Sequence, residues 1–397
     1  MKNKTLLSIS FFLTIALVLT GCTNPWAPNS QDAESEYQPH YTLGGWNGTE
    51  LQVIGDNTTD SNTGESADNS PSKNEEGPYS DPAPSAGMVR SDLTNEWIFP
   101  TEKINRPLAV MVPNNYASLP HYNLSKAGIL YECNVEYEIT RLMPIFDNWS
   151  ELQRIGNIRS ARDYFVNMAM EWDPIILHIG NIWYADEILS RSEVNNIDGN
   201  KQSNAIYRVS TERRDYDQTA YANGYQIVAA AKKLGYPLEH TGNYDFNHFS
   251  FAPKFKPTTL EDVYGNFDAT KVDLSIAYPI DEPYFLYNTE DGLYYRYEYG
   301  MPHTDAATGE QLTFNNIIIQ NTYYEYRQDG AYLIYRLHDT TGDGYFITNG
   351  RGIHVNWKKE GTYGTTRYFD ENGDEIILNQ GKTMICIVQK GDAVLMQ

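Results

Sequence analysis

The chain has 397 residues, of which 52 are Asp or Glu and 30 are Lys or Arg, so its formal net charge is −22. This charge argues against a nucleic-acid partner and against a surface that lies flat on an anionic membrane, because both contacts need clustered Lys and Arg. The length predicts two domains, and three cysteines are too few for a disulfide scaffold.

Residues 1–21 are typical of a lipoprotein signal peptide. Lys2 and Lys4 precede an apolar run over residues 6–19 that is too short to span a bilayer, and the string Leu-Thr-Gly-Cys ends at Cys22. We expect Cys22 to carry a diacylglycerol and an amide-linked chain such as palmitate, because two acyl signals give stable anchoring. The predicted location is the extracytoplasmic face of the cell membrane, with an ordinary secretory signal as the alternative.

Residues 22–96 have the composition of a disordered acidic tether. Asn, Ser, Asp, Glu, Gly and Pro dominate, and Lys73 and Arg90 are its only Lys or Arg side chains. Self-repulsion is expected to extend this segment and lift the folded part away from the membrane. The sequence therefore predicts that a chain beginning near Asn95 is as stable as the whole mature protein.

A first domain of layered α/β type with a mixed sheet is predicted over residues 97–250, within an α+β protein. Buried apolar runs predict strands at 108–112, 129–135, 139–146 and 175–179. Ser160 is expected to cap a helix that ends at Pro174, and a second helix is expected over 219–234, closed by Gly235.

A connector over 251–270 and a β-rich second domain over 271–397 are predicted next. Short apolar runs between Gly, Asp and Asn turns predict strands at 275–278, 292–299, 316–320, 331–338, 352–357, 365–369 and 383–388. Residues 312–320 are long and apolar, so they should be central in their sheet. Cys133 and Cys386 are expected as buried thiols, and a disulfide between them is the less favoured alternative.

Several strings resemble the YerB-like lipoproteins of Gram-positive bacteria. They are residues 106–111 (Arg-Pro-Leu-Ala-Val-Met), 129–132, 155–162 (Ile-Gly-Asn-Ile-Arg-Ser-Ala-Arg), 178–180 and 308–312. The resemblance covers about residues 104–390, and the chain departs from the family pattern at residues 112–115 and 216–218. It implies an extracytoplasmic lipoprotein with a three-layer α/β N-terminal domain and a β-rich C-terminal domain, in a family of unknown function.

The densest polar group of the first domain lies near predicted strand ends and the predicted helix start. It comprises Glu132, Glu136, Arg141, Arg159, Arg162, His178, Asp198 and Arg208. With Ser160 as the cap, Arg159 and Arg162 would flank the positive end of the helix dipole, so an anion is expected to compensate them. That anion is either an internal carboxylate, in structural ion pairs, or the carboxylate or phosphate of a ligand.

These residues give the candidate site. The candidate ligand-binding residues are Arg141, Arg159, Arg162, Asp198 and Arg208, and the candidate acids and bases are Glu132, Glu136 and His178. A lone His at a strand end is more often a hydrogen-bonded core residue than a base.

No cofactor and no metal are predicted. Residues 339–344 imitate the start of a calcium loop, but position 12 is Gly350 where a bidentate Glu is needed, so a hairpin turn is expected. His303 and Asp305 lack a third ligand at convincing spacing and are expected to have turn roles. Familiar hydrolase, metalloprotease and phosphate-loop motifs do not occur in the sequence.

Tyrosine is unusually frequent, with 31 in the chain. Strand alternation predicts one face with Tyr295, Tyr297 and Tyr299 and an opposite face with Tyr294, Arg296 and Glu298. Such a ladder can stack on sugars or receive a protein, and cross-strand packing is the alternative.

Two classes of function remain. The favoured one is a binding or scaffold module at the cell envelope, with a cell-wall glycan or an envelope protein as its ligand, because the sequence has no recognisable unit of nucleophile and base. The alternative is an enzyme acting on an anionic envelope substrate, with the arginines as an anion clamp and Glu132 or Glu136 with His178 as acid and base.

Overall fold

The computed structural model describes residues 81–99, 106–212, 215–242 and 244–397. They lie within one compact unit, Ser70–Gln397. The predicted signal peptide, Cys22 and residues 22–80 of the predicted tether lie outside the described residues. None of the helices in the described ranges is long and apolar enough to cross a membrane.

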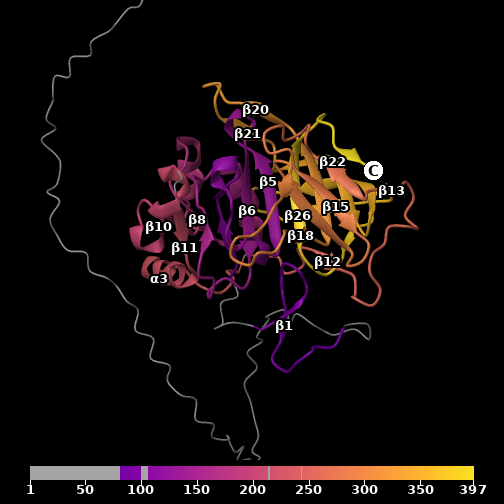
Figure 1. Ribbon diagram of the computed structural model, residues 1–397, viewed down its shortest axis with the longest axis horizontal. Helices are drawn as coiled ribbons and strands as arrows, with labels where there is room; N and C mark the ends of the chain where they lie inside the picture. The colour runs from indigo at the N-terminus through magenta and orange to yellow at the C-terminus, as the bar shows by residue number, and fades with distance from the viewer. Residues whose placement is uncertain (1–80, 100–105, 213–214, 243) are drawn as a thin grey trace, which may run out of the picture. The chain divides into compact units, whose positions relative to one another are not determined.

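A 12-stranded sheet runs through both halves of the described chain (Figure 1). The first half supplies β3 (Leu108–Val110), β4 (Val112–Pro113), β5 (Ile129–Asn134), β6 (Thr140–Phe146), β8 (Ile175–His178) and β9 (Asn196–Asp198). The second half supplies β13 (Phe267–Asp268), β19 (Asn316–Thr322), β22 (Thr340–Thr348), β23 (Arg351–Lys359), β24 (Thr366–Phe369) and β26 (Thr383–Gln389).

The two halves of this sheet meet where β26 pairs in parallel with β5, with Ile387 beside Cys133. The strand β19 lies on the other side of β26, so residues 316–320 are central in the sheet, as predicted for 312–320. Residues 313–314 belong instead to a second sheet. Cys133 and Cys386 are free and buried in different core clusters, which confirms the prediction of buried thiols.

A second sheet has 6 strands and belongs to the second half alone. Its strands are β14 (Lys271–Asp273), β15 (Tyr284–Asn288), β16 (Leu293–Glu298), β17 (Met301–Pro302), β18 (Thr313–Phe314) and β27 (Leu395–Met396). The predicted alternation on β16 is confirmed, because its buried side chains are Tyr294, Arg296 and Glu298. Tyr297 stacks on Tyr284 with ring centroids 4.7 Å apart, so this part of the ladder packs across strands.

Short strands and helices complete the fold. The strands are β1 (Val89–Arg90), β2 (Trp97–Ile98), β7 (Ile155–Gly156), β10 (Tyr207–Arg208), β11 (Ala220–Ala222), β12 (Ser250–Phe251), β20 (Tyr324–Tyr326), β21 (Leu333–Tyr335) and β25 (Ile377–Leu378). The α-helices are α1 (Asp163–Ala169), α2 (Asp186–Leu189) and α3 (Gly224–Leu234). Strand therefore greatly exceeds helix in the described residues, in agreement with a β-rich protein.

Both predicted helix starts are wrong. The N-cap of α1 is Arg162, without a side-chain cap, and not Ser160, because Ala161 is held in a β-bridge with Asn181. The second helix was expected from residue 219, but 220–222 form β11, which pairs with β7 and β10. Tertiary pairing has overridden local helix signals at both places.

The start of α3 has a side-chain cap one residue before the helix. Asn223 Oδ1 accepts a hydrogen bond from the backbone N–H of Gln226 at 2.9 Å. The helix ends as predicted, because Gly235 adopts a left-handed φ of 75° at its C-terminus.

Two predictions for the second half are also wrong. Residues 275–278 form a turn between β14 and β15 instead of a strand. Residues 340–344 belong to β22, and the hairpin turn falls at Asn349 and Gly350, whose φ values are 50° and 75°. A two-residue turn between twisted strands favours positive φ at both positions, which Asn and Gly adopt most easily.

The described part of the predicted tether is packed on the fold. Leu93 is fully buried, and Thr94 O accepts a hydrogen bond from the N–H of Gly381 at 2.9 Å. The Leu93 side chain lies against Gly128, where an added Cβ would meet it at 2.7 Å. One buried leucine is invisible in a composition averaged over the whole segment, which explains why the sequence pattern indicated disorder here.

We expect a chain beginning at Asn95 to be less stable than one beginning at Asp81 by about 2–5 kcal/mol, because it loses the buried Leu93 side chain. Urea unfolding of the two chains measures the difference. Leu93→Ala in the full chain should reproduce most of the loss, and equal stability of the two truncated chains would contradict it.

Candidate functional site

The main strands of the large sheet that carry candidate residues share one direction. β3, β8 and β9 pair in parallel, as do β19, β26 and β5, and both β3 and β5 are antiparallel to β6. Their carboxyl ends therefore lie along one edge of the sheet. We call the connections that follow these strands, together with the start of β6, the carboxyl edge. Ligands of open sheets commonly bind at such an edge.

The segment 159–162 crosses the carboxyl ends of β3 and β8. The N–H of Arg159 donates to Met111 O at 2.8 Å, after β3, and the N–H of Ala161 donates to Gly180 O at 3.0 Å, after β8. This backbone pairing brings Arg159 and Arg162 to the carboxyl edge. Glu136 follows β5 there, and Arg141 is the second residue of β6.

Arg162 and Glu136 form a buried bidentate ion pair. Arg162 Nε and Nη2 each donate to one Glu136 oxygen at 2.6 Å, and both side chains are less than a tenth exposed. Burial would raise the pKa of Glu136, but the hydrogen bonds and charge of Arg162 outweigh it and hold that pKa below its ordinary value. Arg162 therefore has the internal carboxylate partner that the sequence left as one of two alternatives.

Arg141 is buried, and no carboxylate in the described residues forms an ion pair with it. Its Nη1 donates to Ser160 O at 2.6 Å, and its buried Nε has no hydrogen-bond acceptor in the described part of the chain. Burial, and then the neighbouring charge of Arg162, lower the pKa of Arg141 from its ordinary value. Arg162 Nη1 also donates to Ser160 O, at 3.2 Å, so two guanidinium groups converge on one carbonyl oxygen.

Arg159 and Arg208 lie near the surface turn over Tyr216–Gln218. Arg159 Nη1 lies 2.9 Å from Asp217 Oδ2, and the Asp217 side chain is 63% exposed. Arg208 Nη1 donates to Tyr216 O at 2.6 Å, and its guanidinium lies 3.8 Å from the Tyr216 ring centroid. Exposed contacts of this kind contribute little to stability.

His178 and Asp198 hold the loops at the ends of β8 and β9. His178 Nδ1 lies 2.8 Å from Gly180 O, so this nitrogen carries the proton that is donated to the carbonyl. Asp198 Oδ1 accepts from the N–H groups of Gly180 at 2.9 Å and Asn200 at 3.0 Å. The two side chains thus position the loop that contacts residues 159–162.

Exposed aromatic side chains also gather at the carboxyl edge. Tyr116 follows β4, Tyr137 follows β5, Trp183 follows β8 and Tyr323 follows β19, and each is more than half exposed. Sequence reasoning drew attention to the tyrosines of β16 and missed these, because they occur singly in connections. An aromatic residue in a turn after a buried apolar run is the signal that could have found them.

Glu132 lies away from this group, in a buried charge network formed by Glu132, Asp281, Arg296, Glu298, His303 and His121. Arg296 Nη2 donates to both Glu132 oxygens at 2.9 Å, and Arg296 Nη1 donates to Glu298 Oε2 at 2.7 Å. Burial, and then the charge of Glu132, raise the pKa of Asp281 well above its ordinary value. The network joins β5 of the first half to β16 of the second.

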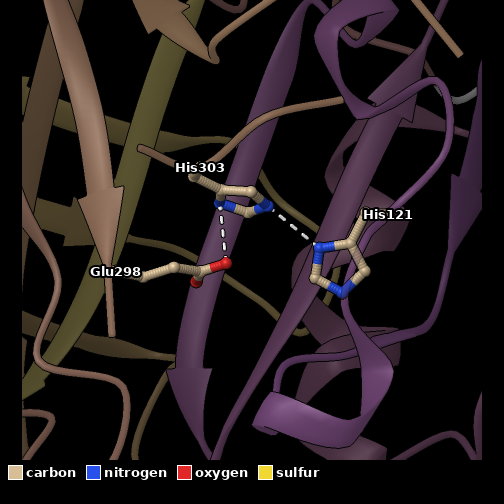
Figure 2. Close-up of side chains that lie close together, drawn as sticks. All are labelled: His121, Glu298 and His303. Atoms are coloured by element: carbon tan, nitrogen blue, oxygen red, sulfur yellow. Dashed lines mark hydrogen bonds and ion pairs between the residues drawn. The ribbon is translucent and has the colours of Figure 1, made fainter. Parts of the chain in front are cut away.

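The two histidines of the network share a hydrogen bond (Figure 2). His121 Nε2 faces Pro113 O at 2.8 Å, so Nε2 carries the proton and Nδ1 accepts one from His303 Nε2, at 2.9 Å. His303 Nδ1 in turn faces Arg296 Nη1 and lies 3.2 Å from Glu298 Oε1. A neutral tautomer of each ring satisfies this chain of donors.

His121, Glu298 and His303 are the group within the described residues whose ligand atoms lie close enough for a metal ion, all within 4.8 Å. Their geometry does not fit one. The two nitrogens of the His303 ring point to opposite sides, one toward His121 and the other toward Glu298, and Arg296 already contacts the Glu298 side. A single ion would meet a guanidinium charge instead of an open coordination position.

Sequence reasoning missed Asp281 and His121 and did not pair Glu132 with Arg296. The predicted alternation on β16 placed two charged residues, Arg296 and Glu298, on what proved to be the buried face. Buried charges need partners, so this was the available signal.

Comparisons with known proteins agree with two domains. Residues 93–237 match the N-terminal domain, and residues 274–385 the C-terminal domain, of a family described as "Protein of unknown function (DUF3048)". The chain is 28% identical to "Putative lipoprotein YerB" of Bacillus subtilis over 259 residues, which are 64% of this chain and 73% of that protein. The crystal structure of YerB matches with a TM-score of 0.65 and 25% identity, over 78% of this chain and 99% of the other.

Proposed function

Because this chain belongs to the DUF3048 family and has the two-domain architecture of its YerB-like members, we propose that it is an envelope lipoprotein that binds a cell-wall glycan through its carboxyl edge. The name of the YerB relative supports an envelope-associated protein. Lipid on Cys22 would anchor it at the extracytoplasmic face of the cell membrane.

The place where the described N-terminal segment joins the fold leaves the carboxyl edge free to face a ligand. The segment around Leu93 and Thr94 contacts Gly128, directly before β5, and Gly381, two residues before β26. The described N-terminal segment thus lies at the amino ends of these strands, and β1 is far from the β20–β21 hairpin in Figure 1. The carboxyl edge therefore lies away from the point where the chain enters the fold, and the predicted tether leaves that edge accessible to a ligand.

The observation that carries the proposal is the set of exposed aromatic rings on that edge. An aromatic face contacts the apolar face of a sugar with little loss of side-chain entropy, and nearby Asn, Asp and Arg groups can hydrogen-bond its hydroxyls. Separate rings on successive connections suit an extended chain of sugars better than a single deep pocket would.

The carboxylates favour binding over catalysis. Glu132 is fully buried against Arg296, and both oxygens of Glu136 are bound by Arg162. A general acid or base has to reach the proton that it transfers, and neither carboxylate is placed for that.

We also propose the layered α/β architecture for the first domain, over 97–250, with the second domain over 271–397. The two faces of the sheet have separate cores, and Phe165 of α1 belongs to one while Ile227 of α3 belongs to the other. Helices assigned to opposite cores support three layers, and the matched ranges of the family support the boundaries.

The test is co-sedimentation of the full chain with purified cell-wall sacculi. We expect Tyr137→Ala/Trp183→Ala to lower the affinity roughly tenfold or more, because two exposed rings are removed. Tyr264→Ala is the matched control, since Tyr264 is 86% exposed and precedes β13 instead of following a strand of the edge. Failure of the unchanged protein to sediment, or an equal loss in the control, would contradict glycan binding at this edge.

A further inference from the structure

The arginines of the carboxyl edge outnumber their carboxylate partners. Arg162 is paired with Glu136 and Arg159 with Asp217, whereas Arg141 forms no ion pair in the described residues. The Arg141 side chain is nevertheless buried, with 5% of the residue exposed. The charge of Glu136 acts on Arg141, but no carboxylate in the described residues hydrogen-bonds to it. A buried guanidinium without such a directly bonded partner is unfavourable.

Glu136 acts on both arginines through its charge but hydrogen-bonds only to Arg162. Its two oxygens already accept from Nε and Nη2 of Arg162 at 2.6 Å each. What Arg141 and Arg162 share is the carbonyl oxygen of Ser160, which carries only a partial negative charge. Two guanidinium groups therefore share the single negative charge of Glu136, and a second full negative charge would stabilise the pair.

Arg141 also retains unused hydrogen-bonding capacity. A guanidinium has five N–H donors, and the buried Nε of Arg141 has no acceptor in the described residues. Planar guanidinium groups match the paired oxygens of a carboxylate or phosphate. The surrounding edge is open to solvent at the exposed Tyr137, and the Arg159 side chain is 29% exposed.

We propose that Arg141 and Arg162 form an oxyanion site that receives an acidic group carried by the glycan. The site rests on the proposed function, since the aromatic rings would hold the sugars and the arginines would select those that bear a negative charge. The acidic group is either the carboxylate of an acidic sugar or the phosphate of a phosphodiester-linked polymer. This local site would let a strongly acidic protein bind an acidic polymer.

A matched pair of sugars tests the site. N-acetylmuramic acid differs from N-acetylglucosamine by an ether-linked carboxylate, so isothermal titration calorimetry on the full chain compares one charge on the same ring. We expect the acidic sugar to bind roughly tenfold more tightly, and this preference to shrink as the salt concentration rises. Inorganic phosphate, titrated separately, distinguishes the second source of the oxyanion.

Arg141→Met should abolish the preference, and Arg141→Lys should keep part of it because the charge remains. Arg351→Met is the matched control, since this arginine begins β23 at the opposite edge and pairs with Asp268 on the surface. If Arg141→Met does not fold, the salt dependence of the unchanged protein still tests the site.

Each result bears on one claim. Equal binding of both sugars would overturn the oxyanion site and leave glycan binding standing. Phosphate binding that Arg141→Met removes, without a preference between the sugars, would support the site with phosphate as its ligand. Failure of all three probes to bind would overturn the oxyanion site, whereas glycan binding itself is decided by the co-sedimentation with sacculi.

Discussion

Replacing Arg296 by Gln is expected to lower the free energy of unfolding by about 3–5 kcal/mol. Arg296 is fully buried and forms ion pairs with Glu132 and Glu298, whose exposed fractions are 0% and 1%. Removing it leaves two carboxylates without a counter-charge in a medium where isolated charge is very unfavourable. Urea unfolding measures the loss as a lower midpoint.

A matched control and a rescue variant separate this mechanism from general damage. Arg336→Gln breaks an exposed pair with Glu325 and should cost less than about 1 kcal/mol. Adding Glu132→Gln to Arg296→Gln should recover part of the loss, because one stranded carboxylate is then neutral. A loss for Arg296→Gln as small as that of the control would mean that the network does not join the two halves of the protein.

The strands of the large sheet were the most predictable part of the fold. β5, β6, β8 and β26 lie within two residues of the predicted runs. Strands buried on both faces are short continuous apolar segments, which their length and flanking turn residues identify. The pairing of β26 with β5 was not predictable. It joins segments about 250 residues apart, and no local pattern states which buried strand lies beside which.

The helix start near Ser160 failed for a different reason. The Ser-Ala-Arg-Asp string has the composition of a capping box, but the backbone at Arg159 and Ala161 is bound to Met111 and Gly180. These long-range hydrogen bonds hold the segment across the sheet and delay the helix to Asp163. The same bonds carry the arginines to the carboxyl edge, so the local error and the site have one cause.

The candidate site was predictable in its residue types but not in its pairs. Glu132 and Glu136 were treated as alternatives because they are close in sequence. In the structure Glu132 lies within β5 and contacts Arg296, while Glu136 follows the strand and contacts Arg162. Strand alternation alone would place residues 132 and 136 on the same face. Because β5 ends at Asn134 and the chain turns at Glu136–Glu138, Glu136 leaves the sheet and reaches a different environment.

Acidification is expected to destabilise the protein from about pH 6.5 downward. Burial, and then His303, lower the pKa of His121 to about 3. Burial, and then Arg296, hold the pKa of His303 well below its ordinary value. Burial, and then Arg367 and Lys359, do the same for the pKa of His248. The folded protein therefore keeps these rings neutral, whereas the unfolded chain protonates each of them below about pH 6.5.

The sign and size of the effect follow from proton linkage. Since the unfolded state binds more protons, the free energy of unfolding decreases as the pH is lowered. The decrease is at most about 1.4 kcal/mol per pH unit for each ring, or about 4 kcal/mol for His121, His303 and His248 together. Asp281 acts in the opposite sense, because burial, and then Glu132, raise its pKa, so the folded state binds this proton at a higher pH than the unfolded chain does. The net slope is therefore smaller than the sum for the three rings.

Urea unfolding at several values between about pH 6.5 and 5 measures this slope. His121→Gln should reduce it by about 1.4 kcal/mol per pH unit, because one ring no longer titrates in the unfolded chain. His354→Gln is the matched control, since its side chain is 37% exposed and stays in contact with water in the folded protein. A stability that is independent of pH over this range would mean that the buried rings of Figure 2 take up protons without loss of the fold, and would remove the argument for a neutral hydrogen-bonded pair.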